Sequence, residues 1–259
     1  MSLRDLDPDL HLRDPARRQR YVTAVFDTVA PSYDRFTRLF SAGMDAGWKR
    51  QLARWVADVV RPGDVVADLA CGTGDVARAI DRAIGGSRDR RVVGLDPNAA
   101  MLRTARDRLS GARASREPGR PAAPVLLRAD LMSLPLAHGA VAAATVAYGF
   151  RNVPDAAAAL DEVARVVRPG GWLFDLDFFL PESPAWRRVF RWYLRGAGRA
   201  VGAWWHGEPE AYGYLARSLD RWVTPPGFRQ LLEGVGFRVS RVLRHLGGGI
   251  CLHAAERVT

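Results

Sequence analysis

A loop of small residues follows a short apolar run between positions 65 and 75 of the chain. Residues 65–69 are mostly β-branched and apolar, and Gly72 and Gly74 follow directly. Because glycine has no Cβ, backbone N–H groups at these positions can approach a ligand closely. Apolar residues at helical spacing begin at Val76, so a helix start adds a partial positive charge beside the glycines. This combination is typical of a site for a nucleotide-shaped ligand.

Two classes of ligand fit this loop. The spacing Gly72-x-Gly74-x-x-Ala77 matches the G-x-G-x-x-G/A fingerprint of dinucleotide sites, so NAD or FAD is one alternative. S-adenosylmethionine is the other, and Asp68, four residues before Gly72, favours it because this ligand carries an ammonium and a sulfonium group. A structural loop that binds nothing is the third alternative.

Acidic residues also follow the next two apolar runs. Asp96 ends the run 91–96, roughly 20 residues beyond the glycine turn, where a carboxylate can accept hydrogen bonds from both ribose hydroxyls. Its alternative role is to cap the helix that follows. Asp130 follows the run 124–129. It could accept a hydrogen bond from the adenine amino group of S-adenosylmethionine, whereas a dinucleotide site has no need of it.

A parallel sheet is needed to bring these residues together. Helical periodicity alternates with apolar runs that indicate buried strands, at residues 65–69, 91–96, 124–129, 140–147 and 172–178. A helix at 156–167 is predicted to end before a Pro-Gly stop at 169–170. Residues 111–124, rich in Gly, Arg, Ser, Pro and Ala, are predicted to form a flexible surface insertion. Residues 14–60 look helical, and the turn between the two apolar patches contains Tyr33, either as part of a lid over the cofactor or beside a simple helix cap. The sequence therefore predicts an α/β fold preceded by helices.

The composition indicates one catalytic-sized unit with a basic surface. Of 259 residues 48% are hydrophobic, and 38 basic residues against 28 acidic ones give a formal net charge of +10. Lys49 is the only lysine, so the excess is arginine, which fits either anionic partners or a coding preference.

No apolar run approaches the roughly 20 residues of a membrane span and no signal peptide is recognisable, so we expect a cytoplasmic protein. Cys71 and Cys251 are expected to be free thiols, and no metal site is expected.

Several motifs resemble those of a known family. They are residues 25–34 (Val-Phe-Asp-x-Val-Ala-x-x-Tyr-Asp), 68–75, 149–153 (Gly-Phe-Arg-Asn-Val) and 210–218 (Glu-Ala-Tyr-x-Tyr-Leu-x-x-Ser). Together they resemble the quinone-biosynthesis C-methyltransferases, which use S-adenosylmethionine to methylate demethylmenaquinol and the corresponding ubiquinone precursor. The glycine motif at 68–75 is common to many methyltransferases, whereas the motifs at 149–153 and 210–218 are specific to this group.

The resemblance implies a fold, a domain organisation and a set of cofactor contacts. The fold is a class I methyltransferase, a Rossmann-like α/β sheet of seven strands with N-terminal helices and a helical cap after strand five. It implies an N-terminal helical segment at 1–60 and a methyltransferase domain at 61–259, with the cap at about 180–222. The residues expected to bind S-adenosylmethionine are Tyr33, Asp68, Gly72, Thr73, Gly74, Asp96, Asp130, Leu131 and Ala147.

Catalysis is expected to depend on residues after the fourth and fifth strands. Arg151, expected to face the mouth of the pocket, is the candidate catalytic residue, acting through electrostatics and orientation because a guanidinium is a poor base. Tyr148, Asn152 and Asp177 are the candidate substrate contacts. Asp177 and the histidines His206, His245 and His253 are candidate bases, although a lone histidine is more often structural.

The chain departs from the family pattern at positions such as Thr37 and Asp177, which leaves more than one class of substrate open. A prenylated quinol is the first interpretation, another small aromatic or natural product is the second, and a non-catalytic cofactor-binding scaffold is the third. Nucleic acid is not expected, since residues 148–151 lack the Asn/Asp-Pro-Pro-aromatic pattern of amino-methylating enzymes. A homodimer is left open.

The segment 186–199 combines aromatic and arginine residues. On a helix its apolar stripe would contain Trp186, Val189, Phe190, Tyr193, Leu194 and Ala197, with arginines toward the other faces. This composition is typical of a helix at the inner face of a membrane, and it also suits a lid that packs on the sheet.

Overall fold

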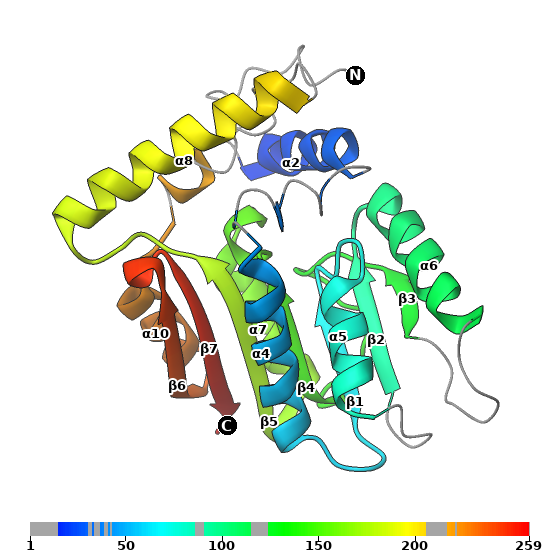
Figure 1. Cartoon of the computed structure of the whole chain (residues 1–259). Helices are drawn as coiled ribbons and strands as arrows, with labels where there is room; N and C mark the ends of the chain where they lie inside the picture. The colour runs from blue at the N-terminus through cyan, green and yellow to red at the C-terminus, as the bar shows by residue number, and fades with distance from the viewer. Residues whose placement is uncertain are drawn as a thin grey trace.

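A seven-stranded sheet forms the centre of the molecule (Figure 1). The computed structural model describes residues 15–30, 33, 37–38, 41, 43–85, 91–114, 124–205, 217–220 and 222–258. The strand order is β3-β2-β1-β4-β5-β7-β6, and β7 alone runs antiparallel to its neighbours. The strands are β1 (Val65–Leu69), β2 (Arg91–Asp96), β3 (Val125–Arg128), β4 (Val141–Ala147), β5 (Val167–Phe178), β6 (Phe237–His245) and β7 (Ile250–Arg257). The predicted seven-stranded α/β fold is confirmed.

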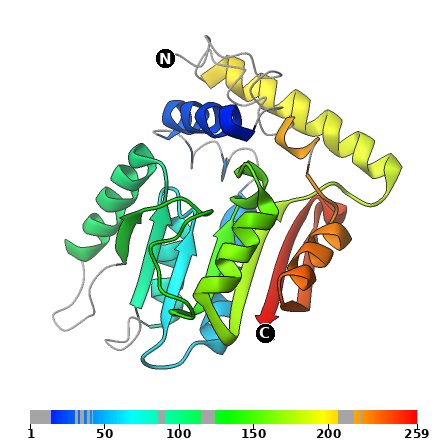
Figure 2. The same cartoon turned by 180° about the vertical axis from the view of Figure 1, so that it is seen from behind.

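Helices cover both faces of this sheet. Figure 1 shows α4 and α5 on one face, and Figure 2 shows α7 and α10 on the other. Helix α6 packs against β2 and β3. The α-helices are α2 (Pro15–Val29), α4 (Asp45–Val59), α5 (Asp75–Ala83), α6 (Ala99–Ala114), α7 (Ala156–Val166), α8 (Pro184–Trp205) and α10 (Pro225–Gly234). None of these described helices has the length and apolar character that crossing a membrane requires.

The core lies between the sheet and its helices. The central strand β4 consists of small and β-branched residues that are buried up to its last position, so helices can pack closely on it. Helix α4 buries Trp48, Leu52 and Val56 in the same core and packs against α5, β5 and β7. This helix, which belongs to the N-terminal part of the chain, is therefore integrated into the main body.

Two boundaries differ from the sequence prediction. A helix to Val167, a Pro-Gly stop and a strand from Trp172 were expected, but the backbone is already extended at Val167. Val167 pairs with Val141 and Trp172 pairs with Ala143, so the residues between them form a bulge in a longer strand. A flexible insertion was expected at 111–124, yet α6 continues to Ala114, and residues 115–123 lie outside the described residues.

The carboxyl ends of the parallel strands meet at one edge of the sheet. The chain leaves β1 toward β2 on one side, whereas β4 lies on its other side, so the strand order reverses between β1 and β4. Open α/β sheets bind ligands in the crevice at such a reversal. Helices α2 and α8 lie beyond this edge in both views (Figures 1 and 2).

Candidate active site

A cavity opens at the strand reversal. The empty space in and over it is about 940 Å³, part of which is open to solvent. The loops after four neighbouring strands contribute to its wall, and α2 closes it from above. Of the residues predicted from the sequence, those that line the cavity are Tyr33, Asp68, Gly72, Thr73, Asp96, Asp130, Leu131, Ala147, Tyr148 and Asn152. Gly74, Arg151 and Asp177 do not line it.

Asp68 holds the loop after β1 in place. One carboxylate oxygen accepts a hydrogen bond from the Ala77 N–H at 2.9 Å, and the other accepts from the Thr145 hydroxyl at 2.7 Å. Asp68 thus connects its own strand to β4 and to the first turn of α5. Burial raises the pKa of Asp68 to about 7, although these hydrogen bonds oppose the rise. These contacts show that Asp68 fixes the loop after β1. The residue also lines the cavity, so a bound ligand would lie beside it.

The two glycines of the loop have different roles. Gly72 has φ of +54°, lines the cavity, and would place a Cβ where no protein atom lies within 4 Å. Its backbone is therefore open to a ligand. Gly74 has φ of +78° at the N-cap of α5, and a Cβ there would lie 3.1 Å from the Ala105 Cβ. Gly74 thus serves the turn and the packing against α6.

Asp96 presents its carboxylate at the end of β2. One oxygen accepts a hydrogen bond from the Gly72 N–H and the other from the Asn98 N–H, both at 2.8 Å. Each carboxylate oxygen can accept a second hydrogen bond, so the group can still receive two hydroxyl donors from the cavity. Burial raises the pKa of Asp96 to about 6. The capping alternative belongs instead to Asn98, whose side-chain oxygen accepts from the Met101 N–H.

The end of β3 and the first turn of α6 form an apolar part of the wall with one acid. Met101 and Leu131 are both buried and both line the cavity. Asp130 is exposed beside them, and one of its oxygens accepts a hydrogen bond from the Met132 N–H at 2.9 Å. A planar nucleobase at this end of the cavity would therefore contact the apolar side chains of Met101 and Leu131, with the Asp130 carboxylate beside it.

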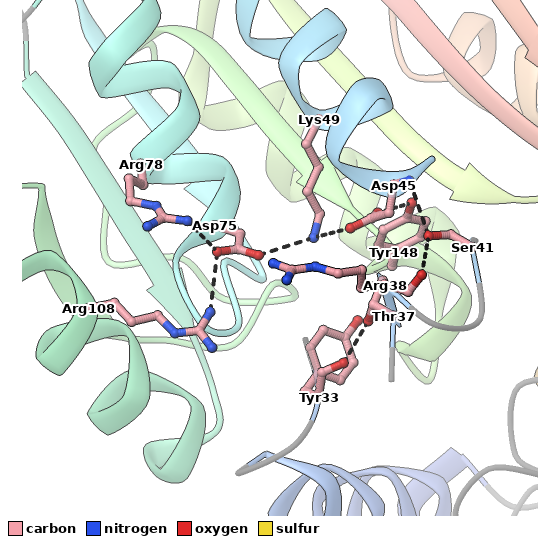
Figure 3. A network of polar contacts seen from close by, with 10 residues as sticks. All are labelled: Tyr33, Thr37, Arg38, Ser41, Asp45, Lys49, Asp75, Arg78, Arg108 and Tyr148. Carbon is pink, nitrogen blue, oxygen red and sulfur yellow. Dashed lines mark hydrogen bonds and ion pairs between the residues drawn. The ribbon is translucent and has the colours of Figure 1, made fainter. Parts of the chain in front are cut away.

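Tyr148 occupies a strained position at the end of β4. Its φ is +61°, a region that residues with a Cβ rarely adopt. The hydroxyl donates a hydrogen bond to Asp45 at 2.7 Å, and the backbone carbonyl accepts from the side chains of Arg151 and Asn152 (Figure 3 shows the Asp45 contact). These contacts stabilise the conformation, so the ring forms a fixed wall of the cavity.

Arg151 does not face the mouth of the pocket as the sequence suggested. It is 6% exposed, and its guanidinium lies 2.5 Å from an Asp177 oxygen, against the rings of Tyr148 and Phe178. Asp177 is fully buried at the end of β5, and burial raises its pKa despite the opposing charge of Arg151. The two residues form a buried ion pair beside Tyr148, and neither side chain lines the cavity.

The described histidines lie away from the cavity. His253 packs edge-on against Phe179 and Phe228 in the core, and burial lowers its pKa to about 3. The ring of His245 packs against Trp48, with centroids 5.3 Å apart and a tilt of 33° between the ring planes. Both are placed as structural residues, and His206 lies outside the described residues.

Several cavity residues were not singled out from the sequence. Gln19, Val22, Thr23 and Phe26 on α2 and Lys49 on α4 line the cavity. Helix α2 is held at both ends of the opening, since Arg18 donates to the carbonyl of Arg151 and Asp27 accepts from the Asn98 side chain. The motif at 25–34 was a usable signal for α2, whereas nothing in the local pattern placed Lys49 beside the loop after β1.

The fold and this site define a class of protein. A sheet of this order, with a glycine loop and acids at successive strand ends around a cavity, is that of a class I S-adenosylmethionine-dependent methyltransferase. A chain from the complex between the Haloferax volcanii Trm112 activator and a putative methyltransferase has the same fold, with a TM-score of 0.60 and 17% identity, covering 90% of this chain and 98% of that one.

Sequence comparison places the chain within one family. The profile of the ubiE/COQ5 methyltransferase family matches residues 15–257. The ubiquinone/menaquinone biosynthesis C-methyltransferase UbiE of Legionella pneumophila (strain Corby) is 33% identical over 240 residues, covering 93% of this chain and 92% of that protein. The protein of the same name from Brucella abortus (strain S19) is 34% identical over 248 residues, covering 95% and 88%. The chain belongs to the ubiE/COQ5 methyltransferase family.

The cavity suits the cofactor of this class. Asp96 can accept the ribose hydroxyls, Met101 and Leu131 can flank the adenine, and the open backbone at Gly72 allows close approach. The buried acid Asp68 lies in the same wall, and a cationic ligand beside it would favour its ionised form. The protein is an S-adenosylmethionine-dependent methyltransferase.

Proposed function

We propose that the enzyme methylates a ring carbon of a prenylated quinol such as demethylmenaquinol. The carrying observation is that the cavity, besides the acids at the strand ends, has apolar and aromatic side chains in its wall, those of Val22, Phe26, Tyr33 and Tyr148. An apolar aromatic ring fits such a wall better than a charged or sugar-like substrate does. The names of the relatives from Legionella and Brucella support the quinone class.

The residues contribute mainly by positioning and by excluding water. S-adenosylmethionine supplies the methyl group, and the acceptor carbon must be electron-rich and aligned with it. Tyr148 and Asn152 line the cavity and contact the substrate in this proposal, with Tyr148 held rigid by Asp45. Arg151 fixes the Tyr148 carbonyl, and Asp177 in turn fixes Arg151. Arg151 is thus a positioning residue, which refines the catalytic role expected from the sequence.

Mass spectrometry of membrane quinones tests the substrate. Cells that lack the protein should accumulate a demethylated quinone, and the wild-type gene should restore the methylated pool. The Asp96→Ala variant, with impaired cofactor binding, should restore it poorly. An unchanged pool in the deletion strain would favour another aromatic substrate, and full restoration by a variant shown to be inactive would indicate the scaffold alternative.

We further propose that α8 brings the enzyme to an anionic membrane surface where such a quinol resides. The helix divides its apolar residues between two sides: Phe190 and Leu194 are buried, while Val189 is 50% exposed and Trp192 is 77% exposed. Trp192 borders a hollow also lined by Arg187, Arg188 and Arg191. Aromatic side chains beside arginines suit the interface of an anionic bilayer.

Both predicted roles of the stripe on α8 find support in the contacts. The buried side packs on the turn between β6 and β7, where a Cβ at Gly249 would lie 2.6 Å from the Phe190 ring. The exposed side is available for a surface. Arg187 and Arg191 also have partners within the protein, the Pro181 carbonyl and Asp220, so they are unsuitable for a clean test.

Liposome flotation with the double variant Arg188→Gln and Trp192→Ser tests this contact. Wild type should float with anionic vesicles and less so at high salt, because each basic residue near the surface contributes about 1 kcal/mol that salt screens. The double variant should float less, and an Arg82→Gln control at the exposed end of α5 should behave as wild type. Equal flotation of the double variant and wild type, or none by either, would contradict the proposal.

A further inference from the structure

Lys49 is a buried cation at the edge of the cofactor cavity. It projects from α4, is 8% exposed, and lines the cavity together with the loop after β1. Its ammonium nitrogen lies 2.8 Å from an Asp45 oxygen and 3.6 Å from an Asp75 oxygen. Figure 3 shows the ammonium group between these two carboxylates. Burial alone would lower the pKa of Lys49, but the two carboxylates more than offset this, so it stays charged.

The two carboxylates are shared with other groups. Asp45 also accepts the Tyr148 hydroxyl at 2.7 Å, and Asp75 also lies 3.3 Å from both Arg78 and Arg108 (Figure 3). Asp75 stands in the first turn of α5, where the helix adds its own partial positive charge. Neither carboxylate is therefore reserved for Lys49. An ammonium group has three N–H donors, and two of them suffice for Asp45 and Asp75.

The position of Lys49 along the cavity indicates the ligand group that it meets. Asp96 and Asp130 mark the end that suits the adenosine, at β2 and β3. Lys49 reaches the cavity from α4, which packs against α5, β5 and β7 on the other side of β1. S-adenosylmethionine extends from its adenosine into a chain that ends in a carboxylate and an ammonium group.

We propose that Lys49 binds the carboxylate of the methionine part of S-adenosylmethionine through its third N–H donor. This inference depends on the methyl donor of the family and not on the proposed quinol. A compact ammonium group fits between two carboxylates and a third anion, whereas the planar fork of an arginine would direct its donors differently. The only lysine of the chain thus occupies a place where arginine would not be equivalent.

Calorimetry with two matched ligands tests the assignment. S-adenosylhomocysteine carries the carboxylate, and its decarboxylated analogue differs from it only in lacking this group. Lys49→Met should weaken S-adenosylhomocysteine about 10- to 100-fold, the effect of losing a charge-assisted hydrogen bond, and leave the affinity for the analogue nearly unchanged. Arg50→Gln, on an exposed neighbour of the same helix, should change neither affinity. Equal weakening of both ligands would overturn the proposal and make Lys49 a scaffold for Asp45 and Tyr148.

A second measurement needs no substitution. Because Lys49 is the only lysine, protein labelled with 15N at the lysine side-chain nitrogen gives one ammonium NMR signal. That signal should shift on addition of S-adenosylhomocysteine and shift far less with the decarboxylated analogue. Identical shifts with both ligands would contradict carboxylate binding even if the variant does not fold. Failure of wild type to bind either ligand would instead contradict the methyl-donor assignment itself.

Discussion

Two buried carboxylates in neighbouring strands, Asp68 and Asp96, differ in what they can offer a ligand. Asp68 is occupied by the backbone of α5 and by Thr145. Asp96 accepts hydrogen bonds from the backbone N–H groups of Gly72 and Asn98. Each of its two oxygens can still accept a hydrogen bond from a hydroxyl group. The sequence motif predicted ligand contacts for both, because strand-end position is visible in a sequence while the partners supplied by distant residues are not.

Replacing Asp96 measures its contribution to cofactor binding. Asp96→Ala removes an acceptor that serves two hydroxyls with charge assistance, so the affinity for S-adenosylhomocysteine should fall by about 1.5–3 kcal/mol, or one to two decades. Isothermal titration calorimetry measures this, with thermal melting as the control for folding. If the wild-type protein binds NAD tightly and does not bind S-adenosylhomocysteine, the cavity is a dinucleotide site and the assignment is wrong.

The pH dependence of binding should report the ionisation of Asp96. Burial raises its pKa to about 6, and hydroxyl donors favour the ionised form, so binding lowers that pKa and releases a proton at acidic pH. Affinity for S-adenosylhomocysteine should therefore fall as the pH drops through about 6 and level off above it. In Asp96→Asn this component should disappear, while any contribution from Asp68 remains in both proteins. Superimposable pH profiles would count against the role of Asp96.

Arg151 should affect turnover more than cofactor affinity. Arg151→Lys keeps the charge beside Asp177 but loses the planar group that contacts the Tyr148 carbonyl and two rings. We expect a lower kcat with an S-adenosylhomocysteine affinity close to wild type. Turnover and calorimetry check this, and Arg165→Lys, at a partly exposed ion pair away from the cavity, is the control. Parallel loss of thermal stability and activity would mean that Arg151 only supports the fold.

At the scale of elements, the start of α5 depends on a glycine for packing as well as conformation. Gly74→Ala would place a Cβ at a φ of +78° and 3.1 Å from the Ala105 Cβ of α6. The strain should cost about 1–3 kcal/mol of unfolding free energy. Thermal or urea unfolding measures this, and Gly234→Ala, where a Cβ meets no atom within 4 Å, is the control. Equal stability of the two variants would contradict the packing role.

The sequence predicted the elements better than it predicted their contacts. Strands β1, β2 and β4 were predicted because short apolar runs bounded by turns are distinctive in a parallel sheet. The positive φ of Tyr148 and the ion pair between Arg151 and Asp177 could not be predicted, because they depend on packing between residues far apart in the chain. The same holds for α2, whose periodicity indicates a helix but not which strand ends it covers.

At the scale of the whole molecule, the strand order explains why one cavity collects residues from so many segments. Four strand ends converge at the reversal between β1 and β4, and α2 closes the opening above them. Helix α8, whose Trp192 is exposed, lies beyond the same edge of the sheet (Figure 1). A lipid-borne substrate and the methyl donor would then reach the enzyme from one side, which is the arrangement that the proposed function requires.

The most direct measurement of the central claim is the fate of a labelled methyl group. Purified enzyme would be incubated with S-adenosylmethionine carrying a 13C methyl group and with demethylmenaquinol in anionic lipid vesicles, and the product examined by mass spectrometry and 13C NMR. The proposed function predicts one added methyl group bonded to a ring carbon, with little transfer by Asp96→Ala. Transfer to an oxygen, or no transfer to the quinol by an enzyme that binds S-adenosylhomocysteine, would contradict it.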